Sequence, residues 1–301
     1  MDYFVLVFLG ALWGASYLFI KIGGEQLPPI TFVAARTTIA GISLLLVALA
    51  RREKLPPLGS SLWKWLIAIG LLNSAVPYTL ITWGELHVSS GLAAILVGAM
   101  PIFTVLLAHW RLHDERLKPR KVVGILIGFA GVVVLFLPDL ENGLQWSLVG
   151  GAAILAAAIS YASAAIVARL HLKSLPHVSV ALGQMITASL ILIPISLLFD
   201  HPWTLSPTPI AVGALVTLAV FGTAFAYLIY YWLIAHVGAT RTSLVTYISP
   251  VVAVILGAVF LNESLEWNTL VGLILIIAGV GLVTSLSLGG RRAQAVTPVA
   301  E

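Results

Sequence analysis

Ten runs of hydrophobic residues, each long enough to cross a lipid bilayer as a helix, dominate the chain of 301 residues. A spanning helix needs about 20 apolar residues, and Gly, Ser, Thr, Pro and aromatic interruptions are tolerated. Only 9% of the residues are charged, against roughly 25% in a soluble domain. We predict an all-α integral membrane protein with ten transmembrane helices, over residues 3–22, 29–50, 62–83, 91–110, 121–138, 147–169, 178–199, 209–235, 241–261 and 268–287.

The two halves of the chain carry the same sequence pattern. Residues 78–88 read YTLITWGELHV and residues 227–237 read YLIYYWLIAHV, with Tyr, Trp, His and Val recurring at an offset of 149. Pro101 and Pro250 share this offset. Further pairs match at an offset of 148, namely Glu115 with Glu263, Gly124 with Gly272 and Gly131 with Gly279. Self-similarity of this kind indicates a duplicated structural unit.

Each copy contains five predicted spans. Because five is odd, the second copy enters the membrane in the opposite orientation, and secondary transporters are commonly built from such inverted repeats. We predict a first five-helix repeat over residues 1–138, a second, inverted repeat over 147–287 and a polar cytoplasmic tail over 288–301. The alternative is a duplication that only stabilises a helix bundle.

Basic residues mark one side of the predicted bundle. With the N-terminus placed in the cytoplasm, the inside segments hold 14 of the 16 Lys and Arg residues, and Lys21 and Arg36 are the other two. Cytoplasmic segments of membrane proteins carry an excess of Lys and Arg. We therefore predict that both termini are cytoplasmic. The net charge of +4 is a topology signal and does not indicate nucleic-acid binding.

The sequence lacks the residues that enzymes and cofactor sites need at membrane depth. It has no Cys, which excludes disulfides and thiolate metal sites, and no HExxH motif or paired acids within a span. We predict no catalytic residue, no metal and no cofactor. No Asp or Glu lies in the interior of a predicted span, so we expect the acidic groups to be in contact with water. Solute movement is then facilitated, or is coupled through another group.

Four stretches of the chain carry a family resemblance: ALWGASYLFIK (11–21), AART (34–37), the segment 99–135 that begins AMPIFTVLL, and the segment 248–283 that begins ISPVVAVIL. They resemble the EamA-type ten-helix branch of the drug/metabolite transporter superfamily. The likeness covers residues 3–286, and the chain is most similar to the YddG-type exporters of aromatic amino acids. The resemblance implies export of amino acids across a bacterial cell (inner) membrane.

Aromatic and amide side chains supply the predicted substrate site. Tyr78 and Tyr227 are matched by the repeat and lie deep in their spans, where a phenol hydroxyl needs a polar partner. A cavity with apolar walls and a few hydroxyl and amide groups suits medium-sized amphipathic solutes. We predict such a cavity between the halves, lined by the first, third, fourth, sixth, eighth and ninth spans. Its substrate-binding residues are Trp13, Tyr17, Asn73, Tyr78, Thr82, Gln184, Tyr227, Tyr231 and Tyr247.

Arg36 and Gln184 occupy matching positions in the two copies. Arg36 could bind a substrate carboxylate through two hydrogen bonds. Alternatively, it could extend outward and hold a loop through Glu25 or Glu85. We favour the structural role for Arg36. We predict that Gln184, which is neutral and both donates and accepts hydrogen bonds, contacts the solute.

Paired prolines predict hinges. Pro101 and Pro250 are expected in the middle of their helices, where proline removes a backbone hydrogen bond and causes a kink. Gly98 and Ser249 lie close to them, and we predict all four as hinge residues. Glycine-rich stretches in the fifth and tenth spans are expected to allow close helix packing.

These inferences converge on a membrane transporter for small amphipathic solutes, above all amino acids, including aromatic ones, that works by alternating access. A small-molecule substrate and the lipid bilayer are the expected partners, with no nucleic acid, and the chain is expected to be a monomer. One alternative is another metabolite carrier of the same fold, for a phosphorylated sugar or a drug. A second alternative, from another class, is an intramembrane enzyme or a receptor.

Overall fold

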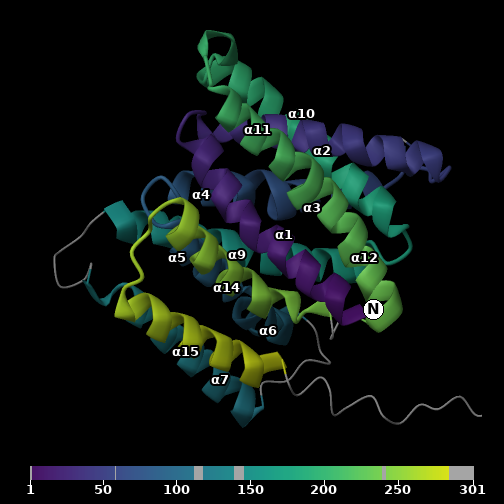
Figure 1. The fold of residues 1–301 in the computed structure, drawn as a ribbon. Coiled ribbons are helices and arrows are strands. Elements are labelled where there is room, and N and C mark those ends of the chain that lie inside the picture. Colours follow the sequence, from purple (N-terminus) through teal and green to yellow (C-terminus); the bar gives the residue numbers. More distant parts are fainter. Residues whose placement is uncertain (1, 58, 112–117, 139–145, 239–241, 285–301) are drawn as a thin grey trace, which may run out of the picture.

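The computed structural model describes residues 2–57, 59–111, 118–138, 146–238 and 242–284, and within them it contains helices and no strand (Figure 1). The first half contains α1 (Asp2–Gly24), α2 (Pro29–Ala50), α3 (Leu62–Gly70), η1 (Leu71–Ala75), α4 (Val76–Gly84), α5 (Ser90–Gly98), α6 (Met100–Arg111) and α7 (Pro119–Leu135). The second half contains α9 (Trp146–His171), α10 (His177–Phe199), η2 (Pro202–Thr204), α11 (Pro209–Thr217), η3 (Leu218–Phe225), α12 (Ala226–Val237), α14 (Val245–Phe260) and α15 (Trp267–Thr284).

The helices coincide with the ten predicted spans. In the described residues, eight helical segments are long and apolar enough to cross a membrane, and α14 is a shorter apolar helix. The remaining span corresponds to α7, which has 17 residues. Large hydrophobic side chains are exposed on many of these helices, as a lipid environment requires. The predicted all-α membrane fold is confirmed. The predicted tail, 288–301, lies outside the described residues.

Helices of the first half pack mainly against helices of the second half. The helix pair α1 and α14, the pair α2 and α10, and the pair α7 and α15 make the most extensive contacts. Figure 1 shows α7 and α15 side by side at the lower edge of the molecule. The largest buried core joins residues from both halves, among them Phe32, Ile95, Ile154 and Met185. The core of the protein is therefore the interface between its halves.

Glycines let α7 and α15 approach closely. A Cβ atom added to Gly124 would lie 2.7 Å from the carbonyl oxygen of Gly279, and one added to Gly131 would lie 3.0 Å from the carbonyl oxygen of Gly272. These distances leave no room for a side chain, so the helix backbones touch. The close packing predicted from the glycine-rich stretches is confirmed.

Two helical runs contain wide, π-helical turns. The run from α3 to α4 includes η1, and the run from α11 to α12 includes η3. At the repeat offset of 149, residues 71–75 correspond to residues 220–224, which lie inside η3. A π-helical turn holds an extra residue and is frequently found at functional sites. The two irregular turns thus occur at matching places in the two halves.

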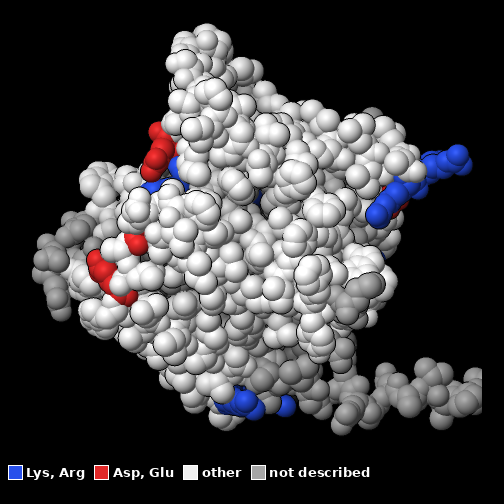
Figure 2. All heavy atoms as spheres, in the orientation of Figure 1, with Lys and Arg blue, Asp and Glu red and all other residues white. Residues whose placement is uncertain are grey.

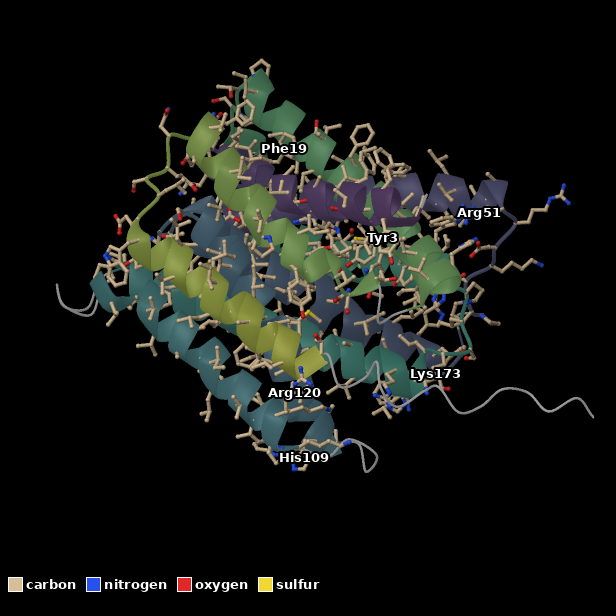
Figure 3. The ribbon with its side chains drawn as sticks, turned by 60° about the horizontal axis from the view of Figure 1, so that its bottom comes forward. Tyr3, Phe19, Arg51, His109, Arg120 and Lys173 are labelled. Atoms are coloured by element: carbon tan, nitrogen blue, oxygen red, sulfur yellow. The ribbon has the colours of Figure 1, made fainter. Side chains whose placement is uncertain are left out.

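The two ends of the helix bundle differ in charge. Figure 2 shows Asp and Glu along the left edge of the molecule, with larger groups of Lys and Arg at the right and at the bottom. Figure 3 places Arg51, Lys173 and Arg120 at this second end, which we call the base-rich end. The opposite, acid-rich end includes Asp200 and Glu263. That the base-rich end faces the cytoplasm stays a prediction.

Carboxylates join the two halves at the acid-rich end. The backbone N–H and the hydroxyl of Thr31 donate to Oδ2 of Asp200 at 3.0 and 2.7 Å, and the Thr31 hydroxyl lies 2.8 Å from that of Ser196. Glu263 accepts from the backbone N–H of Ser90 at 2.7 Å. Both carboxylates sit at helix N-termini, where the helix dipole favours negative charge. These hydrogen bonds join the two halves at the acid-rich end.

The candidate hinge residues lie differently in the two halves. Pro101 is near the middle of the segment Ser90–Arg111, but the helix is interrupted just before it, between α5 and α6. Pro250 lies inside α14, as the sixth of its 16 residues, so the prediction that this proline interrupts a helix is confirmed. A Cβ atom added to Gly98 would lie 3.1 Å from the Pro250 ring. Ser249 donates to the carbonyl oxygen of Gly10 at 3.2 Å.

Candidate substrate site

Polar side chains from both halves meet where the two π-helical turns face α2 and α10. Nε of Arg36, on α2, donates to the hydroxyl of Thr223 in η3 at 3.0 Å. Nδ2 of Asn73, in η1, donates to Oε1 of Gln184 on α10 at 3.0 Å. Each hydrogen bond joins one half to the other. In both cases one partner lies in a π-helical turn. Asn73 in η1 faces Gln184 of α10, and Thr223 in η3 faces Arg36 of α2.

Two tyrosines extend this network. Nδ2 of Asn73 also lies 3.1 Å from the Tyr227 hydroxyl, which lies 3.4 Å from the hydroxyl of Tyr78. The guanidinium carbon of Arg36 lies 3.8 Å from the centre of the Tyr78 ring, a cation–π contact. We call Arg36, Asn73, Tyr78, Gln184, Thr223 and Tyr227 the central polar cluster.

The cluster leaves hydrogen-bonding capacity unused. Gln184 is 1% exposed, and its Nε2 has no partner among the described residues. The hydroxyls of Ser74 and Thr82 are likewise buried without a partner in this part of the chain. A buried polar atom without a partner costs about 1–3 kcal/mol. Such atoms in the middle of a membrane protein are expected where a solute or water completes the hydrogen bonds.

Four of the nine predicted substrate-binding residues belong to the cluster: Asn73, Tyr78, Gln184 and Tyr227. Tyr231 lies beside it, with its ring 6.0 Å from that of Tyr227 and 4.8 Å from the His177 ring. Tyr17 is buried, and its phenol is electrostatically coupled to Arg36. Thr82 is buried one turn beyond Tyr78 on α4.

Two predicted residues lie apart from the cluster. Trp13 packs against Tyr230, with 5.3 Å between ring centres. The hydroxyl of Tyr247 lies 2.7 Å from that of Thr284, and the Tyr247 ring lines a small hollow between α5, α14 and α15. The structure thus gathers the predicted residues of α4, η1, α10 and α12 with Tyr17 of α1, and it places Trp13 of α1 and Tyr247 of α14 in two other locations.

Arg36 is held inside the protein. It is 5% exposed, and its hydrogen bond to Thr223 and its contact with Tyr78 both lie within the core. The interpretation that Arg36 extends outward to a loop is therefore wrong. The reason is that no residue pattern marks η3 as turning a hydroxyl toward α2. Within the core, the guanidinium of Arg36 contacts Thr223 and the Tyr78 ring.

Glu85 contradicts the expectation that the acidic groups are in contact with water. This residue follows the last turn of α4, is 1% exposed, and has no partner for either carboxylate oxygen among the described residues. Nζ of Lys21 donates to the backbone carbonyl oxygens of Glu85 and Val88 and not to the carboxylate. Burial raises the pKa of Glu85 well above its ordinary value; Lys21 opposes this shift and Glu263 adds to it. Glu115 lies outside the described residues.

No group of three or more His, Asp or Glu side chains that could hold a metal ion occurs in the described ranges. The chemistry that the cluster offers is instead reversible binding. Its groups are an amide donor, phenol hydroxyls and aromatic faces. The single guanidinium provides electrostatic attraction for an anionic group at short range.

Comparisons with known proteins agree with this description. The model of the EamA-like transporter family matches residues 2–137 and again residues 148–285. The "Uncharacterized inner membrane transporter YedA" of Escherichia coli (strain K12) is 34% identical over 274 residues, which cover 91% of this chain and 87% of the relative. The "Uncharacterized transporter YoaV" of Bacillus subtilis (strain 168) is 26% identical over 91% of this chain and 93% of the relative.

One solved crystal structure has the same fold. It covers 97% of this chain and 98% of its own, with a TM-score of 0.65 and 22% sequence identity. The family match spans nearly all of the described residues in two consecutive copies, and the similar proteins are described as transporters. The chain is therefore a multi-pass membrane transporter that belongs to the EamA-like transporter family.

Proposed function

We propose that the protein exports small amphipathic solutes, most of all amino acids including aromatic ones, and that it binds them at the central polar cluster. The observation that carries the proposal is the unpartnered, buried Nε2 of Gln184, whose Oε1 accepts from Asn73, the same amide that donates to the Tyr227 hydroxyl. A carboxylate is an acceptor for this amide, and a neutral amide binds a zwitterion without a buried net charge. The YddG-type resemblance supports amino acids as the class and outward transport as the direction.

The aromatic side chains suit the apolar part of such a solute. The rings of Tyr227 and Tyr231 are nearly parallel, with an interplanar angle of 22°, and Tyr161 lies edge-on to Tyr78. Aromatic pairs of this kind contribute about 0.5–1.5 kcal/mol beyond the burial of area. We infer that a solute ring inserts among these side chains while its polar end meets Gln184. Arg36 keeps Tyr78 in place and does not contact the solute.

We also propose that the halves form an inverted repeat and move relative to each other. The matching π-helical turns and the two hydrogen bonds that cross between halves support this arrangement. In transporters of this kind the substrate site lies at the interface of the repeats, and access alternates by movement of one unit against the other. Gly98, Pro101, Ser249 and Pro250 are the proposed hinges. We further propose that a single copy of the chain is sufficient and that both termini are cytoplasmic.

Transport by purified protein tests the substrate class. The protein is reconstituted in liposomes, and exchange of labelled phenylalanine, tryptophan, leucine and glucose 6-phosphate is measured against protein-free liposomes. We expect exchange of the amino acids and none of the sugar phosphate. Exchange of glucose 6-phosphate alone would identify another metabolite carrier. No exchange of any solute, by protein that is folded and monodisperse, would contradict the proposal.

Gln184→Ala tests the binding residue. We expect this variant to lose at least about tenfold in exchange at low solute concentration, because a charge-assisted hydrogen bond is worth about 1.5–3 kcal/mol. Gln26→Ala removes an exposed amide just beyond α1 that accepts from Thr208 of the other half, and it serves as the control for loss of an amide contact away from the cluster. Equal folded yield of both variants is checked by gel filtration. A Gln184→Ala variant that exchanges amino acids like the control would show that Gln184 does not bind the solute.

A further inference from the structure

Glu85 is a carboxylate that the protein buries without neutralising it by an ion pair. It is 1% exposed, and neither carboxylate oxygen has a hydrogen-bond partner in the described part of the chain. Lys21, the basic residue beside it, directs its ammonium group to the backbone carbonyl oxygens of Glu85 and Val88. An ionised carboxylate in such a place is costly unless it is paired, and the group neutralises itself by binding a proton instead.

The surroundings of Glu85 contain charges of both signs. Lys21 and Tyr17 face it from α1, Arg36 faces it from α2, and Glu263 faces it from the loop between α14 and α15. Glu263 is engaged elsewhere, since its carboxylate accepts from Ser90 and Gly91 at the start of α5. The same holds for Lys21 and Arg36, whose hydrogen-bond acceptors are carbonyl and hydroxyl oxygens. Glu85 is thus the acid in this group that is left to gain and lose a proton.

The position of Glu85 connects it to the substrate site. Glu85 follows α4, which carries Tyr78 seven residues earlier and Thr82 three residues earlier. Residues seven apart lie on one face of a helix, about 10 Å apart along its axis. Arg36, which is coupled to Glu85 electrostatically, lies over the Tyr78 ring. A change of charge at Glu85 is therefore felt by the residue that positions Tyr78.

We propose that Glu85 is a proton-binding site that takes up and releases one proton in each transport cycle. This inference rests on the proposed function, because it assigns the coupling ion of the same site. The step is the reversible association of the carboxylate with a proton from water, and no other bond changes. In the structure described here Glu85 is buried at the acid-rich end, where hydrogen bonds join the two halves, and the neutral acid fits this state. Opening of that end admits water, and the carboxylate then releases its proton.

Flux measurements on Glu85→Gln test the coupling. The amide has the size of the neutral acid but cannot titrate. Exchange of labelled phenylalanine is measured at equal pH on both sides of the liposome, and uptake is measured under an imposed pH gradient. We expect Glu85→Gln to keep exchange at equal pH and to lose the acceleration by the gradient. Glu25→Gln, which neutralises an exposed acid just beyond α1, is the control and should respond to the gradient like the unsubstituted protein.

The outcomes separate the inference from the proposed function. If Glu85→Gln is still driven by the pH gradient, the inference is wrong and the transport function stands. If no labelled solute is exchanged by any variant, infrared spectroscopy of the protein decides the inference by itself. We then expect the C=O stretch of a protonated carboxylic acid at neutral pH, present in Glu25→Gln and absent from Glu85→Gln. A spectrum without this band would overturn it. Should Glu85→Gln not fold, Glu85→Asp keeps a titratable group and should shift the midpoint of the band.

Discussion

At the scale of single residues, the unpartnered buried atoms are the most informative feature of this protein. Nε2 of Gln184 and both carboxylate oxygens of Glu85 are buried without a partner among the described residues. Folding alone does not favour such atoms, because each loses its hydrogen bonds to water and gains none. They are expected where function requires a group to stay free. We propose that Gln184 binds a solute and that Glu85 binds a proton.

The buried position of Glu85 predicts how folding stability depends on pH. Because burial raises the pKa of Glu85 well above its ordinary value, the folded protein binds this proton more tightly than the unfolded chain. The stabilisation is present below the ordinary carboxyl pKa and declines as pH rises from there toward the raised pKa. Each pH unit in this window costs about 1.4 kcal/mol. The test is the melting temperature in detergent between about pH 4 and pH 8. As pH rises, the melting temperature should fall less for Glu85→Gln than for Glu25→Gln. Identical pH profiles of the two variants would contradict the burial of Glu85.

At the scale of helices, contact between backbones holds α7 against α15. Gly124 faces Gly279 and Gly131 faces Gly272, so the two crossing points use residues that are matched at an offset of 148. In a bilayer, apolar side chains gain little by facing one another instead of lipid, and close approach of backbones supplies the attraction. This helix pair therefore depends on four positions that carry no side chain.

A small enlargement at these positions should separate the two helices. Gly131→Ala places a methyl group 2.9 Å from Ile276 and 3.0 Å from backbone atoms of α15, and we expect it to destabilise the protein by about 1–3 kcal/mol. Gly213→Ala is the matched control, because a Cβ atom there meets no atom within 4 Å. Thermal unfolding in detergent measures both. Equal melting temperatures would show that α7 and α15 can move apart at no cost.

At the scale of the whole molecule, hydrogen bonds join the two halves at the acid-rich end. Thr31 and Ser196 bring α2 and α10 together there, with 2.8 Å between their hydroxyl oxygens. If access alternates between the two ends, this contact must open during each cycle. A covalent bond across it is therefore expected to stop transport without disturbing the structure seen here.

An engineered disulfide tests this expectation. No native cysteine interferes with it, because the chain contains no Cys. The short side chains of Thr31 and Ser196 lie close enough for a disulfide after replacement of both by Cys. We expect the oxidised double variant to lose phenylalanine exchange and to regain it on reduction. Each single Cys variant should exchange under both conditions. An oxidised, cross-linked protein that still exchanges solute would show that this end does not open.

The sequence predicted the fold better than the site, for physical reasons. Hydrophobic length identifies spanning helices whatever their packing, and repeated glycines identify the α7–α15 contact. Asn73, Gln184, Tyr78 and Tyr227 could be found because polar groups at membrane depth are few. The π-helical turns have no residue signature, so the partner of Arg36 was missed. The burial of Glu85 was not predicted, because a charged residue at the end of a span is normally in contact with water. That burial depends on α1 and on the loop after α14.

If the halves are inverted copies, as we propose, the two hydrogen bonds that cross the centre resemble the paired contacts of a two-fold symmetric dimer. Arg36 of the second helix meets Thr223 of the partner half, and Gln184, its counterpart, meets Asn73 in the reverse direction. In a homodimer with two-fold symmetry both contacts would have to be made by identical residues. Fusion of two copies into one polypeptide removes that restriction, and here one contact has a charged donor and the other a neutral amide. A solute with one ionic and one apolar end then meets an interface whose two sides carry different residues.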